Sequence, residues 1–257
     1  MRLQDKVAIV TGAAAGLGAT YAHAIAREGS RVVVVDVADG EGTARAIRAR
    51  GHQALAVHTD LTDERAVQQM VEQVVAEYGR IDILVNNAGG AGQRPASADI
   101  DKIDREHWDE IMAINLTATM LCMKHVTPHM QRQRSGKIVN VSSRAARGTA
   151  WFGQVTPEYI CAKIGVIGLT RQVAKDLGPF GINVNCLVPS FTVSGPALQA
   201  AWDNMTDEEQ SRMIEATPLR RLPDPAELAS VVVFLVSDES SYVTGACLDV
   251  NGGSLMA

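Results

Sequence analysis

Short apolar runs rich in β-branched residues alternate with segments of helical spacing, starting near the N-terminus. Runs without polar interruption are typical of strands that a parallel sheet buries on both faces. Their alternation with helices predicts an α/β fold, a doubly wound parallel sheet of the Rossmann type with about seven strands and right-handed crossovers. The strands predicted from these runs are Val7–Thr11, Arg31–Asp36, Ala54–His58, Ile81–Val85 and Ala246–Val250.

The segments between these strands have apolar residues at helical spacing. One long helix is predicted for Glu106–Gln133, although Asn115 in its interior has a low helix propensity. Residues 190–217 have no clear periodicity and are predicted to be irregular, as are residues 90–105. Further helices are expected for Glu41–Arg50, from Thr62 to Gly79, from Gly165 to Leu177, and after Asp224.

The size and charge of the chain restrict its class. A chain of 257 residues with 46% hydrophobic and 21% charged residues suits a single globular domain, residues 1–257. The net charge of −5 argues against a nucleic-acid partner. No apolar run approaches the roughly 18 residues that a membrane helix needs, and the N-terminus lacks a signal-peptide core. Four scattered cysteines suggest neither a metal site nor a disulfide framework, so a cytoplasmic location is expected.

A glycine-rich turn follows the first predicted strand. Gly12, Gly16 and Gly18 lie between Val7–Thr11 and a helical segment. Glycines let a backbone approach a pyrophosphate closely, and the free N–H groups of a helix N-terminus attract its charge. The spacing differs from the commoner Gly-x-Gly-x2-Gly fingerprint, and a plain connection between strand and helix is the alternative. The turn therefore favours, but does not alone establish, a dinucleotide site.

The second predicted strand ends in a carboxylate, Asp36, 18 residues after Gly18. An acid at this place in a dinucleotide fold binds the two ribose hydroxyls of the adenosine. A carboxylate repels a 2′-phosphate, and neither Ala15 nor Val37 supplies a cation to hold one. NAD(H) is therefore expected rather than NADP(H).

Tyr159 and Lys163 are four residues apart in a segment with helical spacing. Residues four apart on a helix lie on one face. A lysine cation beside a phenol favours the phenolate and lowers its pKa, which is one way to build an acid/base that works near neutral pH. A solvated surface pair is the alternative.

Together these motifs resemble the short-chain dehydrogenase/reductase family, and the likeness extends over nearly the whole chain. The residues that carry it are Thr11-Gly12-x3-Gly16-x-Gly18, Asn86-Asn87-Ala88-Gly89, Asn115, a fifth strand Ile138–Ser143, Tyr159-x3-Lys163, Ile182 to Pro189, and the tail from Tyr242 to Gly253.

The resemblance implies roles for four catalytic residues. Tyr159 would exchange the proton of the substrate hydroxyl, and Ser143 would hydrogen-bond the substrate oxygen. Lys163 would bind the nicotinamide ribose and lower the tyrosine pKa, and Asn115 would hold a water that connects Lys163 to solvent. The implied cofactor-binding residues are Gly12, Gly16, Leu17, Gly18, Asp36, Asp60, Leu61, Asn87, Gly89, Tyr159, Lys163, Pro189 and Thr192.

The resemblance further implies a substrate lid at about residues 190–217 and a homotetramer or dimer. Other readings of single residues stay open: Ser142 and Ser143 could satisfy turn backbone, and Asp60 could cap the helix that starts near Thr62. Asn87 could be a structural turn residue that also touches the cofactor.

Two residues depart from the family pattern: Ser190 replaces a glycine after Pro189, and Asn251 replaces an aspartate. Tyr159 lies 16 positions after Ser143, so this segment is longer than the family's, which should reshape the substrate mouth. Three arginines near the expected mouth make an anionic substrate a further possibility: Arg94, Arg144 and Arg147.

The function expected is therefore transfer of a hydride between a secondary alcohol, or its ketone, and NAD(H). A cofactor-binding scaffold without catalysis is an alternative from another class, which the presence of Asn115, Ser143, Tyr159 and Lys163 argues against. A lyase or epimerase that uses transient oxidation is a third reading. The identity of the substrate stays open.

Overall fold

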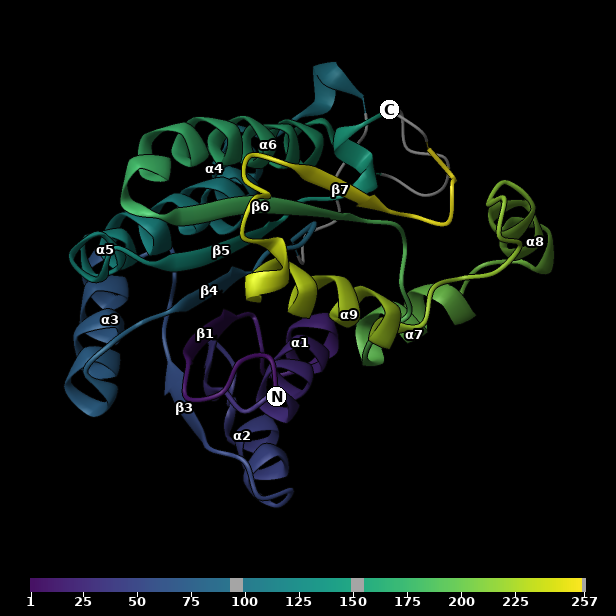
Figure 1. Ribbon diagram of the computed structural model, residues 1–257. Helices are drawn as coiled ribbons and strands as arrows, with labels where there is room; N and C mark the ends of the chain where they lie inside the picture. The colour runs from purple at the N-terminus through teal and green to yellow at the C-terminus, as the bar shows by residue number, and fades with distance from the viewer. Residues whose placement is uncertain (93–98, 149–154, 256–257) are drawn as a thin grey trace.

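The computed structural model describes residues 1–92, 99–148 and 155–255, and their strands form one seven-stranded sheet (Figure 1). The strand order is β3-β2-β1-β4-β5-β6-β7, and every neighbouring pair is parallel. The doubly wound parallel sheet predicted from the sequence is thereby confirmed. The strands are β1 Val7–Thr11, β2 Arg31–Asp36, β3 Ala54–His58, β4 Ile83–Asn86, β5 Gly136–Val141, β6 Ile182–Pro189 and β7 Cys247–Val250.

Helices connect these strands. They are α1 Gly16–Arg27, α2 Glu41–Arg48, α3 Glu64–Tyr78, α4 Arg105–Met112, a π turn Ala113–Thr117, α5 Ala118–Gln133, α6 Pro157–Leu177, α7 Pro196–Asp203, α8 Asp207–Glu215 and α9 Pro225–Val236. Short 3-10 turns occupy Ile100–Lys102, Arg144–Ala146, Gly178–Phe180 and Asp238–Ser240.

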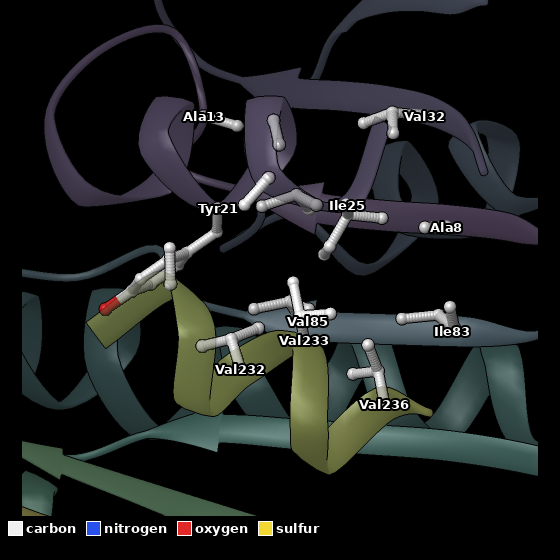
Figure 2. Packing of buried hydrophobic residues seen from close by; sticks show 14 of the residues in the cluster. Ala8, Ala13, Tyr21, Ile25, Val32, Ile83, Val85, Val232, Val233 and Val236 are labelled. Atoms are coloured by element: carbon white, nitrogen blue, oxygen red, sulfur yellow. The ribbon is translucent and has the colours of Figure 1, made fainter. Parts of the chain in front are cut away.

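Helices cover both faces of the sheet (Figure 1). On one face α1 and α9 pack together over β1 and β4, and Figure 2 shows Tyr21 and Ile25 of α1 near Val232 and Val233 of α9. On the other face α3, α5 and α6 bury a second apolar cluster against the same strands. Because both faces are covered, the central strands are mostly apolar, as the sequence runs predicted. The buried polar exceptions Asn86 and Asn140 bond each other at 2.8 Å.

The strand order reverses between β1 and β4, which pair with each other. On its other side β1 pairs with β2, whereas β4 pairs with β5. In open α/β sheets, a ligand site lies outside the carboxyl ends of the strands at such a switch point. The segments that leave β1 and β4 are the glycine turn after Thr11 and Asn87 to Gly90. The topology thus brings two of the sequence motifs to one edge.

The structure corrects the expectation of one unbroken helix over Glu106–Gln133. The π turn Ala113–Thr117 separates α4 from α5, and it contains Asn115. Turns of this kind insert an extra residue into a helix and are frequent at functional sites. The Asn115 side chain donates to the carbonyl of Ile111, one turn earlier, and also leaves the helix to bond Gly90.

The segment predicted to be irregular contains two helices, α7 and α8. Figure 1 shows α8 at the periphery, away from the sheet. Thr206 and Glu209 form a reciprocal capping box at the start of α8. This Thr-x-x-Glu pattern is a start signal for a helix, but α8 is short and polar and gives no apolar periodicity to support it.

The start of α3 also differs from the prediction. Its N-cap is Asp63, whose side chain accepts from the N–H groups of Arg65 and Ala66. Asp60 instead closes the preceding turn by accepting from the N–H and hydroxyl of Thr62. Within the described residues, no helix combines the length and apolar character needed to cross a membrane.

Candidate active site

The glycine turn is built for close approach of backbone to a ligand. A Cβ on Gly18 would lie 2.1 Å from the carbonyl oxygen of Gly12, so any side chain there would force the turn apart. Gly16 has φ of +63°, and a Cβ on it would lie 2.7 Å from the oxygen of Ser194. The N-cap of α1, Ala15, has no side chain that bonds the first N–H groups of the helix. The turn therefore fits a dinucleotide phosphate.

Asn87 joins β4 to this turn. Its backbone N–H donates to the hydroxyl of Thr11 at 3.0 Å, and its side-chain nitrogen donates to the carbonyls of Thr11 and Gly12, each at 3.1 Å. A Cβ on Gly18 would also lie 2.6 Å from that nitrogen. The structural role that the sequence allowed for Asn87 is thus present, and it holds the cradle in shape.

Asp36 lies at the end of β2, beside the glycine turn. Its two carboxylate oxygens accept from the N–H groups of Ala14 at 2.9 Å and Ala38 at 3.0 Å. The carboxylate is thereby held at the same edge as Gly12. A carboxylate that accepts one bond per oxygen retains lone pairs for further donors. Ribose hydroxyls are donors of this kind.

The other predicted cofactor residues surround the same edge. Leu61 is buried and Asp60 is exposed, both in the turn after β3. Thr192 follows β6 and is buried, and its hydroxyl donates to the carbonyl of Ser190 at 3.0 Å. Pro189 ends β6 opposite Val250 of β7.

Both departures from the family pattern have local partners. The N–H of Ser190 donates to the carbonyl of Val250 at 3.3 Å. The side chain of Asn251 donates to the carbonyl of Leu255 at 2.9 Å and accepts from the N–H of Gly253 at 2.9 Å. The Asn251 side chain is therefore bonded within the tail, whereas the bond of Ser190 is one that a glycine backbone would also make.

Ser143 and Tyr159 lie together at the carboxyl end of β5. Ser142 is buried, and its hydroxyl donates to the backbone carbonyl of Lys163 at 2.8 Å. The hydroxyl of Ser143 instead lies at the phenol of Tyr159, whose pKa it lowers, and it accepts from the N–H of Ala145 at 3.2 Å. Of the two serines, only Ser143 is beside the tyrosine. The turn-capping alternative for Ser143 also holds, because its oxygen caps the 3-10 turn Arg144–Ala146.

Lys163 is buried behind Tyr159. Its side chain is only 3% exposed, and its ammonium donates to the carbonyl of Val141 at 3.1 Å. The ammonium nitrogen lies 5.7 Å from the ring centroid of Tyr159. Burial lowers the pKa of Lys163 to about 8. A solvated surface pair, the alternative reading of Tyr159 and Lys163, is wrong.

Asn115 and Lys163 meet at Gly89. A Cβ on Gly89 would lie 2.4 Å from the side-chain oxygen of Asn115 and 3.2 Å from the Lys163 nitrogen. The Asn115 amide exchanges two hydrogen bonds with the backbone of Gly90, at 2.8 and 3.0 Å. The π turn thus holds the segment after β4 next to the lysine, and glycine at position 89 gives both groups room.

The predicted lowering of the Tyr159 pKa is not present in this structure. Burial raises the pKa of the phenol above its ordinary value, and the hydrogen bond with Ser143 acts in the opposite direction. The physical reason is that burial penalises the phenolate more than the neighbouring groups favour it. The charge of Lys163 alone would lower this pKa, but Tyr159 and Lys163 are both removed from water.

Glu158 and His107 form a buried pair that the sequence reasoning missed. The Nδ1 atom of His107 in α4 lies 2.6 Å from a carboxylate oxygen of Glu158, the residue before Tyr159. Their side chains are 5% and 2% exposed. The other Glu158 oxygen and the His107 Nε2 atom are buried and have no hydrogen-bond partner among the described residues. An acid directly before Tyr159 was the available signal, but its burial was not apparent.

The three arginines considered for anion binding differ in their surroundings. Arg147 is paired with Asp249 at 3.2 Å and donates to the carbonyl of Cys247 at 3.3 Å. Arg144 is half-buried, which lowers its pKa. Arg94 lies outside the described residues. The pairing of Arg147 counts against its use as a substrate-binding cation.

A cradle for a dinucleotide and a Ser–Tyr–Lys cluster therefore share the carboxyl edge of one parallel sheet. This combination places the protein in the class of Rossmann-type oxidoreductases. A family model described as enoyl-(acyl carrier protein) reductase matches residues 12–254. With this match and the relatives below, the chain belongs to the short-chain dehydrogenase/reductase family.

Two curated relatives and one solved structure span almost the full length of the chain. Subunit BbsD of a hydroxy(phenyl)methylsuccinyl-CoA dehydrogenase from Thauera aromatica is 39% identical over 98% of both chains. Cis-4-hydroxycyclohexanecarboxylate dehydrogenase from Sinomonas cyclohexanicum is 40% identical over 97% of this chain and 96% of that protein. The crystal structure of levodione reductase matches with a TM-score of 0.89 at 30% identity, covering 98% of both chains.

Proposed function

We propose that this protein is an NAD(H)-dependent oxidoreductase that interconverts a secondary alcohol and its ketone, with Tyr159 as the general acid/base. The observation that carries the proposal is the contact of the Tyr159 phenol with the Ser143 hydroxyl, with the Lys163 ammonium buried behind the ring. These groups lie at the same sheet edge as the glycine turn. The family membership supports oxidoreductase chemistry on alcohols and ketones.

Each side chain has a distinct task in this proposal. A bound nicotinamide supplies the hydride chemistry at the carbinol carbon of the substrate. Ser143 donates a hydrogen bond to the substrate oxygen and holds it at the phenol of Tyr159. Tyr159 takes the hydroxyl proton when the alcohol is oxidised and returns it when the ketone is reduced. Its raised pKa keeps the phenol protonated before reaction, which suits the acid role.

Lys163 and Asn115 are proposed to move the proton between the phenol and solvent. The Lys163 ammonium, with a pKa of about 8, exchanges a proton near neutral pH at small cost. Its nitrogen and the Asn115 oxygen both border Gly89. Asn115 is held by Gly90 and therefore presents a fixed acceptor beside the lysine. Its side chain can anchor a water on the route to solvent.

The preference for NAD(H) rests on Asp36. Its carboxylate borders the glycine turn and repels a 2′-phosphate, whereas ribose hydroxyls can donate to it. Titrations of NADH and NADPH, followed by fluorescence, test this directly. Tighter binding of NADH is expected, and Asp36→Ala should narrow the difference between the two dissociation constants. Tighter binding of NADPH by the wild type would refute the assignment of Asp36.

We further propose that the substrate carries its alcohol on or next to a six-membered ring. The supporting observation is that both curated relatives are named for such compounds, a hydroxycyclohexanecarboxylate and a hydroxy(phenyl)methyl acyl compound. A panel of cyclohexanols, 1-phenylalkanols and linear secondary alcohols with NAD⁺ tests this, read by NADH absorbance. Higher kcat/KM for the ring compounds is expected, and equal values for the linear alcohols would refute it.

The same panel separates the alternative functions. Accumulation of NADH in proportion to the alcohol consumed indicates net oxidation. Conversion of substrate without accumulation of NADH would indicate a lyase or epimerase, in which the NADH formed by transient oxidation returns its hydride to the oxidised intermediate. Binding of NAD(H) without conversion of any member would favour a scaffold.

We also propose a homotetramer, or a dimer, assembled through α5 and α6. Met120 on α5 and Ile164 on α6 are large apolar side chains that the single chain leaves 37% and 50% exposed, and a partner subunit would cover them. Light scattering on the wild type and on Ile164→Glu tests this assembly. A smaller mass for the variant is expected, and an unchanged mass would contradict the assignment of this surface.

A further inference from the structure

We propose that Glu158 and His107 are positioning residues that hold the phenol of Tyr159 in its place relative to Asn115 and Lys163. The inference rests on the proposed function, because it concerns the acid/base of that reaction. Neither residue is assigned to proton exchange with the substrate. Their role is to set the place of the first turn of α6 by a contact with α4.

The first turn of α6 has few other polar anchors. Its N-cap, Thr156, makes no side-chain hydrogen bond to the helix, and the buried Thr156 hydroxyl has no partner within the part of the chain that the structure describes. Pro157 at the first helical position has no N–H to donate. Glu158 therefore provides the polar link from this turn to a neighbouring helix, through the 2.6 Å contact with His107. Tyr159 is the next residue of the same turn.

The other end of the link is rigid. The side chain of Asp104 caps α4 by accepting from the N–H groups of Glu106 and His107, at 3.3 and 3.2 Å. His107 itself is 4% exposed. The helix that bears His107 continues directly into the π turn that contains Asn115. One continuous segment thus positions both Asn115 and, through Glu158, Tyr159.

Glu158 does not face the same way as Tyr159. Consecutive side chains on an α-helix are separated by about 100° around the axis. Glu158 is 1% exposed and points to α4, whereas the phenol of Tyr159 points to Ser143. Glu158 therefore acts through the backbone of the turn, and its effect should appear in the rate of the chemical step.

A purely stabilising role explains this pair poorly. Buried polar pairs often stabilise a fold no more than apolar residues of similar volume would. Among the described residues, one Glu158 oxygen and the His107 Nε2 atom have no hydrogen-bond partner, which adds a cost of burial to the pair. The presence of such a pair one residue from the acid/base is accounted for when its geometry serves the reaction.

The experiment compares Glu158→Ala and Glu158→Gln with a matched buried carboxylate far from the site. Asp82 is 4% exposed, accepts from the N–H of Val7 at 2.9 Å, and precedes β4 at the opposite end of the sheet. Asp82→Ala therefore removes a comparable buried acid without touching the Tyr159 turn. The measurements are kcat, KM for alcohol, NADH dissociation constant, melting temperature and the pH profile of kcat.

We expect Glu158→Ala to lower kcat by about 10- to 100-fold, the loss typical of a displaced reacting group, while NADH affinity stays within about twofold. Glu158→Gln, which can still bond His107, should restore most of that rate. The tyrosinate absorbance titration, taken as the difference from Tyr159→Phe, should shift in Glu158→Ala only. Asp82→Ala should lower the melting temperature with little change in kcat.

Three outcomes overturn the inference: an unchanged kcat in folded Glu158→Ala, equal losses in the Gln and Ala variants, or the same kcat loss in Asp82→Ala. If Glu158→Ala does not fold, the double variant His107→Leu/Glu158→Leu takes its place. We expect this double variant to have a normal melting temperature and a low kcat, and a wild-type kcat would refute the inference. Absence of turnover by the wild type on every alcohol would instead refute the proposed function, and the tyrosinate titration would still test the pair.

Discussion

The burial of Lys163 predicts that replacing it increases stability while removing activity. The perturbation is Lys163→Met, which keeps the length of the side chain and removes its charge. Burial lowers the pKa of Lys163 from 10.5 to about 8, and its side chain is 3% exposed. A pKa shift of this size means that the charged side chain lowers the free energy of unfolding by about 3 kcal/mol.

The sign follows from proton binding. Below about pH 8 the ammonium is charged in both states, so the full cost is present. Between pH 8 and 10.5 the unfolded chain binds the proton more strongly than the folded protein, so the stability of the wild type rises relative to the variant. The variant loses the bond from the lysine to the carbonyl of Val141, which costs about 1 to 3 kcal/mol. A net gain of about 1 kcal/mol at pH 7 remains.

Urea unfolding of the wild type and Lys163→Met at pH 7 and pH 10, with kcat measured on the same samples, checks this prediction. The expected result is a more stable and inactive variant at pH 7, with the stability gain lost or reversed at pH 10. Subtracting the two proteins at each pH cancels the titration of all other groups. A stability difference that does not change with pH would refute the assignment of a buried, charged lysine.

Three further changes have defined outcomes. The buried hydroxyl of Tyr21 has no hydrogen-bond partner among the residues that the structure describes, and burial raises its pKa above the usual range. Tyr21→Phe should therefore stabilise the fold by about 1 kcal/mol in calorimetry, and a lower melting temperature would show that the hydroxyl is bonded. Gly18→Ala should abolish NADH binding, because its Cβ would meet the Gly12 oxygen at 2.1 Å, and retained affinity in a titration would contradict the cradle. Arg147→Ala, which breaks the pair with Asp249, should lower kcat/KM equally for 4-hydroxycyclohexanecarboxylate and its methyl ester. A loss for the acid alone would show that Arg147 binds the substrate carboxylate.

The sequence predicted the sheet because its strands are buried on both faces, which leaves an unambiguous apolar signal. Val7–Thr11 and Arg31–Asp36 were predicted with the bounds that the structure has. The π turn around Asn115 was not predicted; its Asn115 bonds Gly90, 25 residues away. Periodicity within one segment carries no information about such contacts.

The site was predicted in part. Spacing and resemblance indicated Tyr159 and Lys163, and the structure brings both to the predicted Ser143. The direction of the Tyr159 pKa shift was wrong, because burial cannot be read from the identity of two neighbours on a helix. Glu158 was overlooked for the same reason: an acid in the first turn of a helix ordinarily faces solvent, whereas here His107 of α4 buries it.

The central claim is that the phenol of Tyr159 exchanges the substrate proton while the cofactor binds elsewhere on the same edge. The most direct measurement is the rate of NADH formation in a single turnover, with wild type and Tyr159→Phe compared at saturating NAD⁺ and a ring-bearing secondary alcohol. The account predicts loss of at least about 100-fold in the rate for the variant, with its NADH dissociation constant within about twofold of the wild type. NADH formation by Tyr159→Phe at the wild-type rate would contradict it.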